Sequence, residues 1–191
     1  MRKLLVVLVI GLILSGCRRT VVIDDLGDAS FELINQDSVA VTFPDDFEGK
    51  YVVMGFIYTH CPDICPLITQ NLIKIQNGLG NPDDVQFLAV SFDPKRDTPA
   101  VLKDFKNVFG LDRNFDFLTG DSLTIQTMMD SVRVRTQVSF STTTEAGEEM
   151  YFLNHSDKIM VVDPNSKVII EYGGSQPSVP SLIIEDLNKI R

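Results

Sequence analysis

Two cysteines four positions apart, Cys61 and Cys65, are the residues of this chain whose type and spacing best support chemistry. They lie in the run Tyr-Thr-His-Cys-Pro-Asp-Ile-Cys-Pro, between an apolar segment typical of a strand and an amphipathic segment typical of a helix. The N terminus of a helix stabilises negative charge, so we expect it to lower the pKa of both thiols. Residues i and i+4 of a helix face the same side, and the two sulfurs could therefore share one metal or close a disulfide. The pair predicts a redox site or a soft-metal site, and its spacing does not decide between them.

The elements around this pair alternate between strand and helix patterns. Strands are expected at 31–34, 39–43, 51–58, 85–90, 115–118, 159–162 and 168–172, and helices at about 66–79, 98–109, 123–132 and 180–190. The polar stretch 141–149 predicts a loop. Without the segment from about 111 to 150, the order from Tyr51 is that of an α/β, thioredoxin-like fold. We therefore expect that fold, with an N-terminal β-hairpin and an inserted strand-helix-loop segment.

The chain has two histidines, His60 and His155, and the second lies just before the expected strand 159–162. In a thioredoxin-like layout, the loop entering that strand lies against the paired cysteines. Two sulfurs and one imidazole nitrogen suit copper in either common oxidation state and could also hold zinc. We therefore expect Cys61, Cys65 and His155 to be metal ligands, and His60 to point into solvent.

Three motifs together resemble the SCO/SenC family of membrane-tethered copper chaperones. They are the run 61–66 (Cys-Pro-Asp-Ile-Cys-Pro), the run 93–99 (Asp-Pro-Lys-Arg-Asp-Thr-Pro) and His155 before a strand, and the resemblance covers about residues 45–190. It implies copper bound by Cys61, Cys65 and His155, and a role in assembling the dinuclear copper centre of cytochrome c oxidase subunit II. The residue before the histidine is often aspartate in that family but is Asn154 here, so Asp157 or a backbone carbonyl would have to orient the imidazole.

The residues alone are also compatible with functions other than copper delivery. The main expectation is a metallochaperone, which is not an enzyme. The alternative is a thiol-disulfide oxidoreductase that uses Cys61 and Cys65 as a redox-active disulfide and reduces a partner's cysteines. A peroxidase is disfavoured because Tyr58 stands where peroxiredoxins carry a threonine or serine. Structural zinc is disfavoured because such sites usually have four protein ligands. In either main reading a thiol reductant must keep the pair reduced before copper binds.

The first residues predict export and anchoring. Arg2 and Lys3 precede an apolar run too short to span a bilayer, and Leu-Ser-Gly-Cys at 14–17 resembles a bacterial lipoprotein cleavage box. We therefore expect a signal peptide at 1–16, lipidation of Cys17, a tether over 17–30 and a copper-binding domain over 31–191. This places the domain outside the cytoplasm, on a bacterial cell membrane or its periplasmic face.

The charge of the chain limits the classes of partner that it can bind. The 191 residues carry 17 basic and 26 acidic side chains, and loss of the signal peptide makes the balance more negative still. A nucleic-acid partner is not expected, because phosphate contacts need a cationic face. With Cys17 lipidated, the chain keeps only Cys61 and Cys65, which are too close in sequence to stabilise the fold much as a disulfide.

Overall fold

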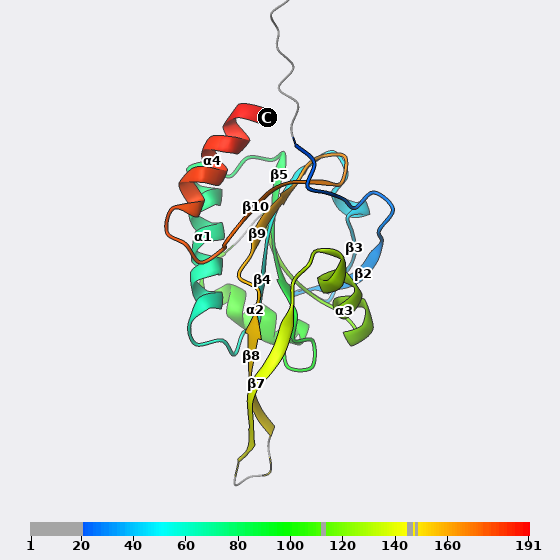
Figure 1. The fold of residues 1–191 in the computed structure, drawn as a ribbon, viewed down its shortest axis with the longest axis vertical. Helices are drawn as coiled ribbons and strands as arrows, with labels where there is room; N and C mark the ends of the chain where they lie inside the picture. The colour runs from blue at the N-terminus through cyan, green and yellow to red at the C-terminus, as the bar shows by residue number, and fades with distance from the viewer. Residues whose placement is uncertain (1–20, 112–113, 145–146, 148) are drawn as a thin grey trace, which may run out of the picture.

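The computed structural model describes residues 21–111, 114–144, 147 and 149–191 (Figure 1). Eight strands form one sheet in the order β1-β10-β9-β4-β5-β6-β2-β3, and two more form a separate sheet, β7-β8. The strands are β1 (Asp24–Asp25), β2 (Phe31–Asn35), β3 (Ala40–Phe43), β4 (Tyr51–Ile57), β5 (Val85–Ser91), β6 (Phe115–Thr119), β7 (Thr136–Thr143), β8 (Glu149–His155), β9 (Ile159–Val162) and β10 (Lys167–Tyr172). The helices are α1 (Ile64–Gly78), α2 (Pro99–Val108), α3 (Ser122–Ser131), α4 (Val179–Ile190) and a short 3-10 turn, η1 (Asp45–Phe47).

The predicted thioredoxin-like order is confirmed. β4 pairs in parallel with β5 and antiparallel with β9, which places the segment after β4 close to the segment that enters β9. All but the first residue of β4 and every residue of β5 are buried, as expected for strands covered on both faces. Helices α1 and α4 lie together on one side of this sheet, and α3 lies on the other (Figure 1). The predicted N-terminal hairpin is also present, as β2 and β3.

Helix α1 packs closely on β4 because of a glycine in the strand. The helix buries Ile68, Leu72 and Ile75 completely. A Cβ atom on Gly55 would lie only 2.7 Å from Cγ2 of Ile68 and 3.1 Å from Cδ1 of Leu72. The missing side chain therefore lets α1 approach the strand and brings the start of the helix to the carboxyl end of β4.

Two further helix starts follow their sequence signals. Thr98 caps α2 by accepting the N–H of Val101, and Pro99 occupies the first turn, where its missing N–H costs nothing. Asp121 caps α3 by accepting two backbone N–H groups, from Leu123 and Thr124. These side chains fix the connections after β5 and β6.

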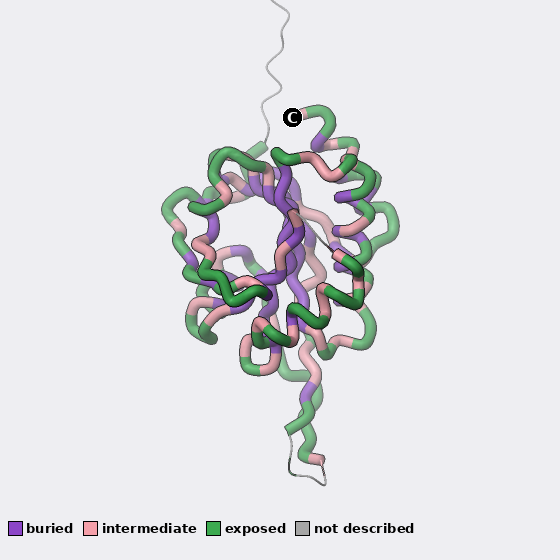
Figure 2. The backbone as a smooth tube through the Cα atoms, turned by 180° about the vertical axis from the view of Figure 1, so that it is seen from behind, coloured by how far each residue is buried: buried purple, intermediate pink, exposed green. Residues whose placement is uncertain are grey.

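The loop predicted over 141–149 is wrong at both ends: residues 141–143 lie in β7 and Glu149 begins β8, whereas Thr144 and Gly147 lie outside the strands. Strands β7 and β8 form a hairpin that projects from the body of the molecule, and they pair from Thr136 with His155 to Thr143 with Glu149 (Figure 1). Most of its residues are exposed on both faces (Figure 2). Backbone pairing rather than core burial forms these strands, so their polar composition concealed them. Threonine, which is β-branched and favours strands, was the available signal.

The folded sheet reaches further toward the N terminus than residue 31. Within the expected tether, β1 pairs with β10 at Asp24 and Asp25, and Leu26 is buried in the core. The predicted signal peptide and Cys17 lie outside the described residues. Among the described residues, no helix has the length and apolar character needed to cross a membrane.

Candidate metal centre

The two cysteines lie where β4 passes into α1. Helix α1 begins at Ile64, so Cys65 is in its first turn, while Cys61 precedes the helix. The backbone N–H of Cys65 points at Sγ of Cys61 at 3.5 Å. The sulfurs therefore converge through the turn before the helix, and the expectation that they share one helical face is wrong. Cys61 is partly exposed, Cys65 is buried, and both are free thiols.

His155, the last residue of β8, meets this pair. Its Nε2 lies 3.5 Å from Sγ of Cys65. The three donor atoms, the two sulfurs and one imidazole nitrogen, all lie within 4.8 Å of one another. His60 is not part of the cluster: its ring is about half exposed and contacts Thr59 through Nδ1 at 3.1 Å. The structure thus brings together the three residues that the sequence singled out.

The orientation of the His155 ring suits coordination through Nε2. Its Nδ1 lies 3.0 Å from the carbonyl oxygen of Ser156, which can only accept, so Nδ1 carries the proton. Nε2 is then the nitrogen with the lone pair, and it faces Sγ of Cys65 at 3.5 Å. The backbone carbonyl therefore takes the orienting role, since Asn154 is exposed and Asp157 instead bonds the backbone and hydroxyl of Ser175. The rings of Phe92 and Tyr58 enclose the imidazole at centroid distances of 4.8 and 5.9 Å.

The electrostatics of Cys65 differ from the sequence expectation. Burial raises the pKa of the Cys65 thiol, and this effect outweighs the hydrogen bond that its sulfur accepts from the backbone N–H of Tyr58 at 3.3 Å. The proximity of Cys61 raises that pKa further. The prediction that the helix lowers it is therefore wrong for Cys65. A buried thiol of this kind releases its proton readily only when a metal cation replaces the proton on the sulfur. Deprotonation is therefore coupled to metal binding.

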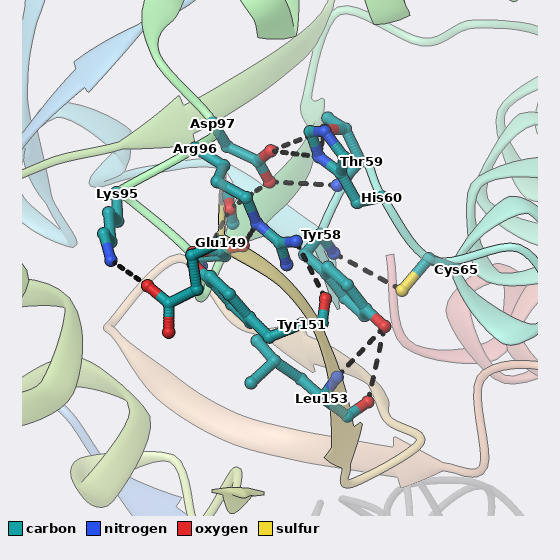
Figure 3. A network of polar contacts seen from close by, with 12 residues as sticks. Tyr58, Thr59, His60, Cys65, Lys95, Arg96, Asp97, Glu149, Tyr151 and Leu153 are labelled. Atoms are coloured by element: carbon teal, nitrogen blue, oxygen red, sulfur yellow. Dashed lines mark hydrogen bonds and ion pairs between the residues drawn. The ribbon is translucent and has the colours of Figure 1, made fainter. Parts of the chain in front are cut away.

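A polar network beside the cluster was missed by the sequence reasoning. It joins Tyr58 just after β4, Arg96 in the segment after β5, and Tyr151 in β8 (Figure 3). One signal was available: Tyr151 and His155 are four positions apart, an even spacing, so they share one face of β8. Asp93 and Asp97 are buried and bonded within the protein, and neither belongs to the donor cluster.

Three of the described methionines, Met128, Met129 and Met160, are buried in the core, which is the ordinary role of this side chain, and Met150 is exposed. The remaining arrangement, two thiols and one imidazole, supports two kinds of chemistry. It can bind a soft cation such as copper, and it can exchange electrons between a dithiol and a disulfide.

The fold and the cluster together define a thioredoxin-like protein with a Cys-Cys-His site. The SCO1/SenC family model matches residues 24–190, and the chain belongs to that family. A curated relative, the SCO1 protein homolog of Bacillus subtilis, is 30% identical over 159 residues, which cover 82% of this chain and 79% of the relative.

Solved structures agree in fold. ScoI of Bradyrhizobium japonicum with copper bound has a TM-score of 0.70 at 28% identity and covers 84% of this chain and 96% of its own. A SCO1/SenC family lipoprotein of Bacillus anthracis has a TM-score of 0.67 at 31% identity, covering 84% and 92%. BsSco is a member of the Sco family of cytochrome c oxidase assembly proteins in which a disulfide switch was identified. Its structure has a TM-score of 0.67 at 26% identity and covers 89% of this chain and 95% of its own.

Proposed function

We propose that this protein is an extracytoplasmic copper-binding metallochaperone that delivers copper to, or prepares, the dinuclear copper site of cytochrome c oxidase subunit II. The observation that carries the proposal is the convergence of Cys61, Cys65 and His155, whose donor atoms lie within 4.8 Å of one another. Membership of the SCO1/SenC family, the copper in a related structure and the assembly role named for another support the metal and the destination.

In this proposal copper is cargo, and each of the three side chains has a defined part. The thiolates of Cys61 and Cys65 provide soft donors, and Nε2 of His155 provides a donor of intermediate character that accepts both copper oxidation states. Three protein ligands leave a position at which a partner's ligand can bind before the metal transfers. Cys61 is partly exposed as a residue whereas Cys65 is buried, so a partner would approach the site from the side of Cys61.

A second candidate function is thiol-disulfide exchange on cysteines of a partner protein. The observation that favours it is the unequal exposure of the two cysteine residues, since Cys61 is partly exposed and Cys65 is buried. In exchange chemistry an accessible thiol attacks the partner's disulfide and a sheltered one resolves the mixed disulfide. The same dithiol would serve both functions, so copper loading and exchange would compete.

We further propose that the chain is held on a membrane by a lipid on Cys17, after removal of residues 1–16. The Bacillus anthracis relative is a lipoprotein, which supports this form of anchoring. The described chain starts at the end of the molecule opposite the β7-β8 hairpin (Figure 1). A lipid attached before that start would leave the hairpin end facing away from the membrane, toward a partner.

The test is metal titration of the reduced protein with copper(I) and copper(II). His155→Ala should weaken copper binding by about 10-fold or more, because it removes one of three donors. His60→Ala, which changes the chain's other histidine one residue from Cys61, is the matched control and should bind as the unmodified protein does. Equal copper affinity in His155→Ala and the unmodified protein would rule out the three-ligand site, and retained disulfide exchange in that variant would then favour the second function.

A further inference from the structure

We propose that Arg96 is a positioning residue for the metal centre: held by Asp93 and stacked on Tyr151, it fixes β8 so that His155 meets the two cysteines. This inference rests on the proposed function, because it concerns how the third ligand is presented to copper. It assigns a role to residues of the run 93–99 beyond the start of α2.

The need for such a device follows from the topology. The cysteines are carried by β4 and α1, which belong to the main body, whereas His155 ends β8, which pairs only with β7. No ladder of backbone hydrogen bonds joins β8 to the eight-stranded sheet among the described residues. The position of His155 therefore depends on the short connection 156–158 to β9 and on side-chain contacts between the hairpin and the body.

Arg96 supplies the central contacts. Its Nε lies 2.5 Å from Oδ2 of Asp93, and its Nη1 donates to the backbone carbonyl of Tyr151 at 2.8 Å. The guanidinium lies 3.6 Å from the centroid of the Tyr151 ring. The hydroxyl of Tyr151 in turn donates to Oδ1 of Asp93 at 2.6 Å, which closes the loop of contacts. We call these three residues the clamp.

The clamp is largely removed from water. The Arg96 side chain is 16% exposed and that of Asp93 is 4% exposed. Ion pairs and cation–π contacts are stronger when water is excluded, and the planar guanidinium serves both at once. A lysine would keep the charge but lose the stacking and the second hydrogen bond.

Tyr58 connects the clamp to the sulfur ligands. Its hydroxyl accepts the backbone N–H of Leu153 at 3.2 Å and approaches the carbonyl of the same residue at 3.5 Å. Its own backbone N–H donates to Sγ of Cys65. Arg96 lies beside the Tyr58 ring as well, with the guanidinium carbon 5.6 Å from its centroid (Figure 3).

Strand geometry transmits the clamp to the ligand. Tyr151, Leu153 and His155 alternate along β8 and face the body, while Met150 and Asn154 are exposed. Because side chains of a strand repeat every second residue, fixing Tyr151 and Leu153 also fixes the direction of His155. Loss of the clamp should free the imidazole and leave the two sulfurs in place.

The test compares Arg96→Ala, Arg96→Lys and Tyr151→Phe in the full chain loaded with copper(II). Arg96→Ala should weaken copper binding by about 10- to 100-fold, the usual effect of removing a residue that orients a ligand. It should also reduce the imidazole nitrogen coupling in the electron paramagnetic resonance spectrum. Lys103→Ala is the control, because it breaks an exposed ion pair with Asp37 that involves neither β8 nor the clamp, and it should change neither.

A thermodynamic cycle separates positioning from general stability. If Arg96 acts through His155, Arg96→Ala should cause little further loss of copper affinity in the His155→Ala background. The same loss in both backgrounds, or an unchanged nitrogen signal in Arg96→Ala, would overturn the inference. Should Arg96→Ala not fold, Arg96→Lys carries the same comparison, and Tyr151→Phe tests the Asp93 contact alone.

Failure of the proposed function would look different. In that case His155→Ala itself would leave copper binding unchanged, whatever Arg96 does.

Discussion

The carboxylate of Asp97 accepts a hydrogen bond from the backbone N–H of Thr59 at 3.0 Å, and so ties the segment before Cys61 to the start of α2. The same carboxylate accepts the hydroxyl of Thr59 at 2.5 Å and that of Ser91 at 2.6 Å. Asp97 is completely buried, so water cannot readily replace it as the acceptor for these donors. The aspartate thus holds the backbone that carries the first sulfur.

Asp97→Ala should lower the free energy of unfolding by about 1–3 kcal/mol, because it leaves buried donors without an acceptor. Asp97→Asn is the control: its oxygen can accept from Thr59 N–H while its amide donates to the Thr59 hydroxyl. Urea unfolding of the three proteins measures the difference. An alanine variant as stable as the unmodified protein would show that the carboxylate does not hold this segment.

The charge state of Asp97 gives a pH dependence with a definite sign. Burial raises the pKa of this carboxyl, and the hydrogen bonds from Ser91 and Thr59 only partly oppose the effect. The folded protein then binds the proton more tightly than the unfolded chain does. The resulting stabilisation is complete below the unfolded pKa, about 3.9, and is lost as the pH rises through the folded value.

Relative to Asp97→Asn, the unmodified protein should therefore lose stability as the pH rises from about 4 through that window. The measurement is the difference in unfolding free energy between the two proteins at a series of pH values. Because all other carboxyls are common to both, their contributions cancel. A difference that stays constant, or that grows in favour of the unmodified protein with rising pH, would contradict the raised pKa.

Gly55 sets the distance between β4 and α1, and an added methyl group should disturb both stability and the site. Gly55→Ala places a Cβ 2.7 Å from Ile68 Cγ2, so we expect a loss of about 1–3 kcal/mol from overpacking. Ile68→Ala removes that atom, and in its background the added cost of Gly55→Ala should be smaller. Unfolding of the single and double variants tests this; strictly additive losses would mean that this contact is not the cause.

The core strands and helices were predictable because buried elements carry apolar residues at the regular spacing of a strand or a helix. The apolar run of β4, the helical repeat of Ile68, Leu72 and Ile75, and the caps at Thr98 and Asp121 each placed an element close to where it lies. The two cysteines and His155 could be linked because the fold class itself juxtaposes the end of β4 with the entry to β9.

The rest depended on contacts that leave no periodic signal. Hairpin β7-β8 buries little, so its strands lack the apolar alternation that reveals others. Arg96 and Tyr151 lie 55 residues apart in the sequence, and no local pattern predicts their contact. The pKa of Cys65 was misjudged because the helix terminus is visible in the sequence whereas the depth of burial is not.

Oxidation of the dithiol should abolish copper binding, because a disulfide forms from Cys61 and Cys65 by loss of two electrons and two protons and leaves no thiolate to coordinate the metal. The proposed site then retains only the imidazole of His155, which is a weak ligand alone. We expect the reduced protein to bind one equivalent of copper(I) and the protein treated with diamide to bind none, with binding restored by dithiothreitol. Titration of free thiols in the same samples supplies the control. Copper binding that survives complete loss of free thiols would show that the metal lies elsewhere, whereas a parallel decline would place both sulfurs in the site.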